Sequence, residues 1–234
     1  VEVPIYAAVS AAAVNEATDL SNTAINPSSV TITASENGIM TTLTDLARNS
    51  APRNVAADIG KLFGEAIAKK IDTDLTALFD GFSTAVGAAD AALTVAKLFE
   101  SVANLRNSAV PISDVSAVLH PMIAYDLKAN LTNTFANSNA NDLANEALRN
   151  GFVGRIAGVP IYETSNLDNT GTTGDYKNGV FHRDALGLAM MQDLKIETQR
   201  DASLRADEIV ATAVYGVGEL HDSYGIELLA DSSI

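Results

Sequence analysis

Hydrophobic residues recur at spacings of three and four over a long central part of the chain. The members of this series are Val55, Ile59, Leu62, Phe63, Ala66, Ile67, Ile71, Leu75, Leu78 and Phe79. One continuous apolar stripe of this kind indicates an amphipathic helix. Pro52 lies near its start, and Gly81 follows its last member, as expected for the two ends. The pattern predicts a helix over residues 53–80 that is about 40 Å long, which suits a structural spine.

The C-terminal third of the chain has the patterns of β-strands. Residues 194–198 alternate between apolar and polar side chains, which predicts one buried and one solvated face. Residues 209–217 are rich in Val, Ala, Thr and Tyr, which predicts a strand covered on both faces. Shorter apolar runs predict further strands at 180–181, 186–190 and 226–229.

Between the long helix and these strands, helix and strand signals alternate. The predicted elements are helices over 91–107, 122–131 and 142–149, strands at 115–119 and within 151–162, and loops over 133–141 and 167–179. Pro121 precedes the second of these helices, at a position that proline favours. The mixture of helices and strands predicts an α+β fold.

Residues 1–46 behave as a separate unit. Two strand-like pieces, 3–9 and 30–43, flank a polar span over 15–29. This pattern predicts a long two-stranded arm with little apolar bulk. An isolated hairpin is marginally stable in water, so the arm is expected to lie on the rest of the chain or on a neighbouring copy. Val1 already resembles the middle of a strand, and we expect an upstream segment that is removed by processing or lies outside this numbering.

The composition of the chain excludes several classes of binding partner and of metal or disulfide site. It has 234 residues, of which 47% are hydrophobic, and a net charge of −14 from 29 acidic and 15 basic residues. Such acidity repels phosphate backbones and anionic membranes, so we expect neither general nucleic-acid binding nor a membrane partner. Cysteine is absent, which excludes disulfides and thiolate zinc sites.

Several motifs occur in a fixed order along the chain. They are AVNEA at 13–17 with VTIT at 30–33, residues 43–50 before the long helix, GVPI at 158–161 with Ser165 and Asn166, GDY at 174–176 before Val180 and Phe181, and Arg205 and Asp207 before the strand at 209–217. In this order the chain resembles the major capsid proteins of tailed bacteriophages, which have the Hong Kong 97 capsid fold. The resemblance covers essentially all of residues 1–234.

The resemblance implies an α+β fold of the Hong Kong 97 type, with an extended β-hairpin arm, a peripheral domain with a long spine helix, and an axial domain. Its expected segments are 1–46 for the extended loop that reaches over a neighbour, 47–108 for the peripheral domain with the spine helix, 109–178 for the axial domain, and 179–234 for the closing strands of the peripheral domain.

The resemblance also implies a function. The chain is expected to be a coat protein that self-assembles, as hexamers and pentamers, into an icosahedral shell around the double-stranded DNA genome of a tailed phage. Its expected partners are further copies of itself, a portal, and scaffolding or decoration proteins, with DNA enclosed without sequence-specific binding. It is expected in the virion, and in the host cytoplasm before assembly. The alternatives are an encapsulin-like compartment that encloses a cargo enzyme, and a monomeric α+β binding module.

The arm is the expected main contact with a neighbour, because it cannot bury its apolar residues alone. The candidate interface residues are Val9, Val14, Glu16, Leu20 and Ile25; packing on their own chain is the alternative. Some members of the family join subunits by a lysine–asparagine isopeptide bond on the extended loop. The first lysine here is Lys61, beyond the arm, so we expect a shell held by non-covalent contacts.

Histidine chemistry has little support in the sequence. The three histidines, His120, His182 and His221, do not have the paired spacing of metal ligands. His182 and His221 lie close to Asp184 and Asp222, but neighbouring residues of a strand point to opposite faces. We therefore expect neither pair to act as a catalytic dyad.

Other catalytic and binding motifs are missing too. There is no Gly-x-Ser-x-Gly turn for a hydrolase nucleophile, and Gly171-Thr172-Thr173-Gly174 lacks the following lysine of a phosphate-binding loop. Asp72, Asp74 and Asp80 have no calcium-loop glycine and are expected on a solvated face. We expect no enzyme activity and no catalytic, cofactor or metal site.

Overall fold

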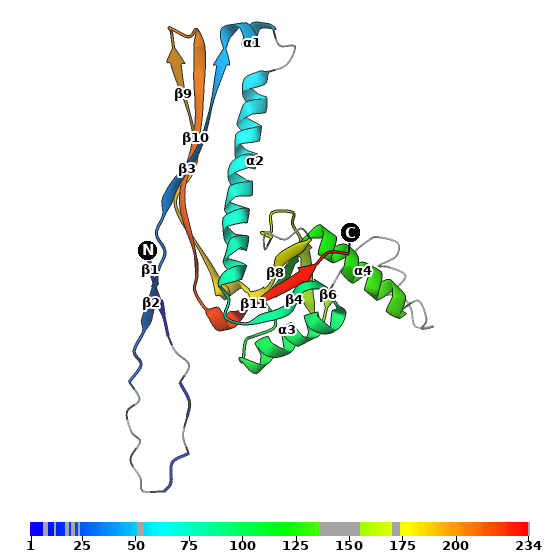
Figure 1. The fold of residues 1–234 in the computed structure, drawn as a ribbon. Helices are drawn as coiled ribbons and strands as arrows, with labels where there is room; N and C mark the ends of the chain where they lie inside the picture. The colour runs from blue at the N-terminus through cyan, green and yellow to red at the C-terminus, as the bar shows by residue number, and fades with distance from the viewer. Residues whose placement is uncertain are drawn as a thin grey trace.

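A computed structural model shows an elongated limb joined at its foot to a mixed α/β unit (Figure 1). The structure describes residues 1–6, 9–11, 13–16, 19, 22, 24–50, 54–135, 155–169 and 174–233. In the limb, a long helix runs beside three long strands, and a two-stranded arm continues beyond them. No helix among the described residues is long and apolar enough to cross a membrane.

The predicted spine helix is present as α2 (Val55–Thr76). Asn54 caps its start, where the side-chain Oδ1 accepts a hydrogen bond from the Ala57 N–H at 3.4 Å. Phe63 and Ile67 are buried on its inner face, and burying a side chain of this size contributes about 1.5–3 kcal/mol. The 3₁₀ turn η1 (Ala77–Gly81) follows directly, so the helix predicted over 53–80 is confirmed within the described residues except for this tightened end.

Three antiparallel strands line the helix in the order β3 (Ser35–Thr44), β10 (Ala206–Glu219) and β9 (Leu186–Asp201). Ala211 and Ala213 of β10 are buried in the two apolar clusters that contain Phe63 and Ile67. Such small side chains leave room for the larger residues of the helix. The limb is therefore a sheet with α2 packed along one face.

The arm is shorter in its pairing than the sequence predicts. Only β1 (Glu2–Ile5) and β2 (Ser28–Thr31) pair with each other, while β3 pairs with β10. The prediction of one arm strand through 30–43 is therefore wrong. Its second half extends the sheet of the limb, because there β10 offers it a long hydrogen-bonding partner.

The foot of the limb carries a six-stranded sheet. In order it contains β4 (Ala85–Ala92), β11 (Gly225–Asp231), β8 (Asp175–His182), β5 (Val115–Leu119), β7 (Val159–Glu163) and β6 (Arg155–Ile156). Helices α3 (Val95–Asn107) and α4 (Pro121–Phe135) pack against it, and their buried residues share one core with β5, β8 and β11. This core is the largest in the described chain.

Several predicted boundaries are corrected here. The helix predicted from residue 91 begins at Val95, because residues 85–92 form β4 and the Thr94 hydroxyl caps the helix. The loop predicted over 167–179 ends earlier, because β8 begins at Asp175 between β11 and β5. Residues 133–135 belong to α4. The helix predicted over 142–149 lies outside the described residues.

The two long strands differ from expectation in burial. Residues 194–198 of β9 are exposed on both faces, so the prediction of one buried face is wrong. In β10, residues of one face are buried and those of the other are only half-buried. The difference follows position, since β10 lies between β3 and β9, whereas β9 is an edge strand whose residues 194–198 have little cover on either face within the described chain.

Candidate subunit interface

The arm is fixed to the limb at its base. The amino group of Val1 donates to the Ile32 carbonyl at 2.8 Å, and the Ile32 N–H donates to the Val1 carbonyl at 2.8 Å. Ile32 is only 3% exposed; a Cβ at Gly218 of β10 would collide with it, and a Cβ at Gly216 would collide with the Thr33 carbonyl. The glycines thus allow the base of the arm to press onto the sheet, and the arm extends away from this root (Figure 1).

The predicted interface residues lie beyond this root. Val9, Val14 and Ile25 are 62%, 47% and 58% exposed, and Glu16 is exposed as well. Leu20 lies outside the described residues. The three apolar side chains thus have little cover from their own chain, and their contact with a neighbour stays a prediction.

Strand β9 carries a second set of exposed apolar residues, to which the sequence does not point. We call Met190, Met191, Leu194 and Ile196 the β9 edge cluster; they are 46%, 81%, 38% and 46% exposed. The pairing of β9 with β10 shifts register between Thr212 and Tyr215, which is a bulged region that interrupts the ladder. Edge strands present unpaired backbone groups, so this side of the limb is suited to a contact.

Ion pairs fix the far end of the limb. The Arg200 guanidinium donates two hydrogen bonds to the carboxylate of Asp45 in α1 (Asp45–Ser50), at 2.7 and 2.6 Å. The bond to Arg200 lowers the pKa of Asp45 below its usual value. Arg48 pairs with Asp207 of β10. These bonds tie α1 to the β9–β10 end and hold this end in a defined shape.

Asp72 and Asp74 of α2 are half-buried rather than on the solvated face that the sequence predicts, whereas Asp80, in η1, is exposed as predicted. Asp72 Oδ2 accepts hydrogen bonds from Thr164 Oγ1 at 3.0 Å and from Asn166 Nδ2 at 2.6 Å. The Thr76 hydroxyl donates to the Asn166 carbonyl at 3.2 Å. These bonds fasten the spine helix to the segment after β7, across about ninety residues of sequence.

The other two acidic residues also have partners. Asp74 Oδ2 accepts a hydrogen bond from the Tyr215 hydroxyl at 2.7 Å, and burial together with this bond raises the pKa of Tyr215 to about 12. Asp80 pairs with Lys177 at 2.7 Å, and this bond raises the pKa of Lys177. Sequence spacing could not reveal these partners, because they lie on distant strands.

The histidines serve packing and turns. His120 stacks on Tyr176 with ring centroids 3.6 Å apart, and burial lowers the pKa of His120. His182 Nδ1 accepts a hydrogen bond from the Asp184 N–H at 3.2 Å and caps the 3₁₀ turn η2 (Arg183–Ala185). His182 Nδ1 also lies 3.6 Å from Asp184 Oδ2, because the chain turns into η2 after His182, so the expectation that these two side chains point to opposite faces is wrong.

Three carboxylates meet where β8 begins and where β4 and β11 end. Oxygens of Asp90, Asp175 and Asp231 lie within 4.8 Å of one another. Asp175 is buried, and its Oδ1 accepts a hydrogen bond from the Asp90 N–H at 3.0 Å. The contact links two strands of the sheet, and an acidic cluster alone does not define a metal site.

Solved structures with a similar fold include several from bacteriophages and one from an encapsulin complex. The chain matches one from Mycobacterium phage Che8 with a TM-score of 0.79 and 20% identity, covering 97% of this chain and 83% of that one. It matches the capsid structure of cyanophage P-SCSP1u with a TM-score of 0.76 and 19% identity, covering 100% and 84%. The holo-SrpI encapsulin complex from Synechococcus elongatus matches with a TM-score of 0.65 and 12% identity, covering 88% and 76%.

The sequence of the chain matches a family of phage proteins but no curated protein. No curated protein sequence matches the chain. The family of phage capsid proteins matches over residues 27–226, which leaves out only the ends. The fold described above is that of the Hong Kong 97 type of capsid protein, as the resemblance predicted. The chain belongs to the phage capsid protein family.

Proposed function

We propose that many copies of this chain close into an icosahedral shell around the double-stranded DNA genome of a tailed phage. The observation that carries this proposal is the arm, whose Val9, Val14 and Ile25 have little cover from their own chain. A surface that is incomplete in one copy is completed by another when the copies assemble with closed symmetry. The role is mechanical, and its active surface is the contact between subunits.

Within the shell, the segments take the roles expected from the resemblance. The arm with β1 and β2 reaches over a neighbour, and the limb of α2, β3, β9 and β10 forms the peripheral domain. The six-stranded sheet with α3 and α4 forms the axial domain of hexamers and pentamers, so β4, α3 and β11 fall on the axial side of the bounds expected from the sequence. Weak contacts repeated over many copies give a stable particle by mass action and multivalency. The absence of a lysine before Lys61 supports a shell held without covalent cross-links.

The partners follow from the same proposal. A portal, and scaffolding or decoration proteins, would contact the shell, which forms in the host cytoplasm and ends in the virion. The net charge of −14 supports an inner wall that repels DNA and lets it move during packaging. A structure of the particle with a net basic inner face would refute this last point.

The alternative is a shell around a protein cargo. The match to an encapsulin complex from Synechococcus elongatus favours it, but the family of the chain is that of phage capsids. A monomeric binding module, by contrast, would have no use for the uncovered arm.

The test is electron microscopy of the purified full-length gene product, together with absorbance at 260 and 280 nm. We expect uniform polyhedral particles that contain DNA when they are taken from an infected host. Particles that contain protein instead of DNA would favour the compartment. A protein that stays monomeric with its scaffold present would refute the shell.

A further inference from the structure

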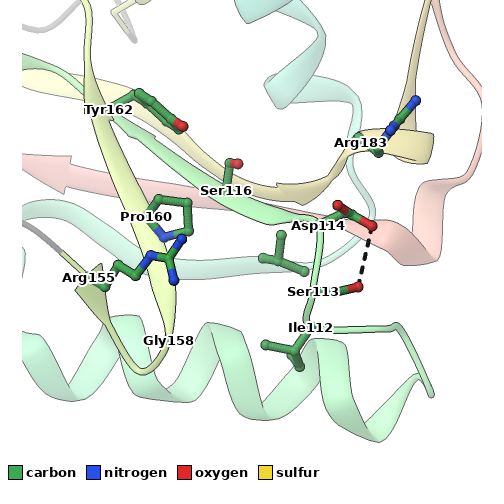
Figure 2. A pocket seen from close by; sticks show the side chains of 10 residues that line it. Ile112, Ser113, Asp114, Ser116, Arg155, Gly158, Pro160, Tyr162 and Arg183 are labelled. Carbon is green, nitrogen blue, oxygen red and sulfur yellow. Dashed lines mark hydrogen bonds between the residues drawn. The ribbon is translucent and has the colours of Figure 1, made fainter.

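A groove of about 480 Å³ opens at the β7 side of the six-stranded sheet, away from the arm. Its walls come from the segment before β5, from β6 and β7, and from η2 (Figure 2). The lining residues that matter most are Asp114, Arg155, Tyr162 and Arg183, all exposed. The two arginines lie on opposite sides of the groove in this view, with Ser116 between them.

Both arginines are attached to rigid backbone. Arg155 pairs with Pro160 in a hairpin closed by Ala157 and Gly158, whose φ angles of 56° and 83° are those of a tight type I′ turn. Arg183 lies in η2, and its N–H donates to the Asp114 carbonyl at 3.1 Å. The backbone therefore fixes where each side chain leaves the wall of the groove, while the exposed guanidinium groups are held by no contact within the described residues.

Neither guanidinium has an acidic partner in the described part of the chain. The ion pairs found there use other basic residues, such as Arg48, Lys177 and Arg200. The groove holds one carboxylate, that of Asp114, whose Oδ2 accepts a hydrogen bond from the Ser113 hydroxyl at 3.3 Å. A chain with 29 acidic and 15 basic residues thus places around one groove two cations that have no acidic partner among the described residues.

We propose that this groove binds an acidic segment of a neighbouring copy of the chain. A second copy fits because the chain has a large surplus of carboxylates, and guanidinium groups bind carboxylates with paired, directional hydrogen bonds. DNA is the weaker candidate, because the net charge of −14 repels phosphates. The exposed ring of Tyr162, which is 59% exposed, offers an apolar floor beside the charges. The inference rests on the proposed shell function and adds a contact distinct from the arm.

The first experiment reverses the charges. The double variant R155E/R183E is compared with wild type and with K69E, because Lys69 is an exposed cation of α2 without an ion pair in the described residues. Sedimentation velocity measures the assembled fraction, and circular dichroism checks the fold of each subunit. We expect at least a tenfold lower assembled fraction for R155E/R183E, and a K69E variant like wild type. Normal shells from R155E/R183E would overturn the inference and leave the shell function standing, whereas a wild type that forms no shells would reject the function itself.

The second experiment does not depend on the double variant folding. The variant R155K keeps the charge and supplies an amine that a carbodiimide joins to a contacting carboxylate, with release of the urea by-product. Shells are assembled from mixed ¹⁵N-labelled and unlabelled R155K chains and then digested for mass spectrometry. We expect isotope-mixed peptides that join residue 155 to an Asp or Glu of another copy. Cross-links from residue 155 only within one chain, or none at all, would overturn the inference. It would also be overturned if R155E/R183E assembled normally and its particles differed from wild type only in their DNA content.

Discussion

The same chemical change, glycine to alanine, should have opposite effects at two positions of this chain. Gly179 lies in β8 and is buried, and a Cβ there would stand 2.8–2.9 Å from three atoms of the Phe79 ring. Gly60 lies in α2, where a Cβ would meet nothing within 4 Å. The two substitutions therefore separate crowding in the core from the conformational cost of glycine.

The magnitude at Gly179 follows from what surrounds Phe79. That ring is 1% exposed and lies 5.1 Å from Phe181 and 6.2 Å from Phe82, measured between centroids. Because the ring has neighbours on several sides, it cannot move to an ordinary contact distance without shifting them. Overpacking of this kind costs about 1–3 kcal/mol. We expect G179A to lower the free energy of unfolding by that amount.

At Gly60 the sign is reversed. Glycine inside a helix is less favourable than alanine by about 0.8–1 kcal/mol, and the new methyl group has free space. We expect G60A to raise the melting temperature of the unassembled subunit by about 2–4 °C, the shift that 1 kcal/mol produces in a domain of this size. G179A should lower it by several degrees.

The assay is thermal and urea unfolding of unassembled subunits, followed by circular dichroism. Subunits are needed because assembly adds stability that depends on concentration. A G179A variant as stable as wild type would refute the packing of Phe79 against β8, and a G60A variant that is less stable would refute the open environment on α2.

Three further predictions concern the apolar residues of the arm, the ionisation of Glu219, and covalent cross-links between subunits. Replacing Val9, Val14 and Ile25 with serine should leave subunit stability nearly unchanged, since exposed sites contribute within about 0.5 kcal/mol each, but should prevent shell assembly; intact shells by electron microscopy would contradict this. Burial and the neighbouring Asp222 raise the pKa of Glu219 above 4.5, so stability from this group is present at low pH and is lost as the pH rises through its folded-state pKa. At pH 7 the variant E219Q should therefore melt at a higher temperature than wild type. When the pH is lowered from 7 to 4.5, the melting temperature of E219Q should rise less than that of wild type. The same change of melting temperature with pH in both proteins would reject this. Mature particles boiled in detergent should give a band near the mass of one chain, whereas a ladder of covalent oligomers would show cross-linking.

The sequence predicted those elements whose signals are local. The spine helix is marked by its own apolar stripe, and the strand predicted at 115–119 is a short local segment, so both are confirmed within the described residues. The capsid fold itself came from the order of motifs, which the family match confirms. The interface candidates could be chosen because the arm has few apolar residues and no core of its own.

The missed features depend on distant partners. The sequence predicts a helix from residue 91, but parallel pairing with β11 makes residues 85–92 a strand, and Gly87 permits it with a φ of 100°. Asp72 and Asp74 appeared to be solvent-facing because Asn166 and Tyr215 approach them only after folding. The exposure of the β9 edge cluster was not predicted. Alternation of apolar and polar residues predicts that one face of a strand is buried, but not whether the same chain or another copy buries it.

The free edge of β9 also bears on the behaviour of the subunit before it assembles. An open strand with exposed methionine, leucine and isoleucine favours irregular aggregation, and the charges of Asp193, Lys195 and Glu197 on the same strand oppose it. Salt screens exposed charges beyond about 10 Å at 0.1 M, so the colloidal stability of a subunit stock should fall as salt rises. Light scattering against sodium chloride concentration measures this directly. Ordered assembly and irregular aggregation then both use the free edge of β9. The ionic strength of the buffer sets what fraction of the subunits assembles and what fraction aggregates.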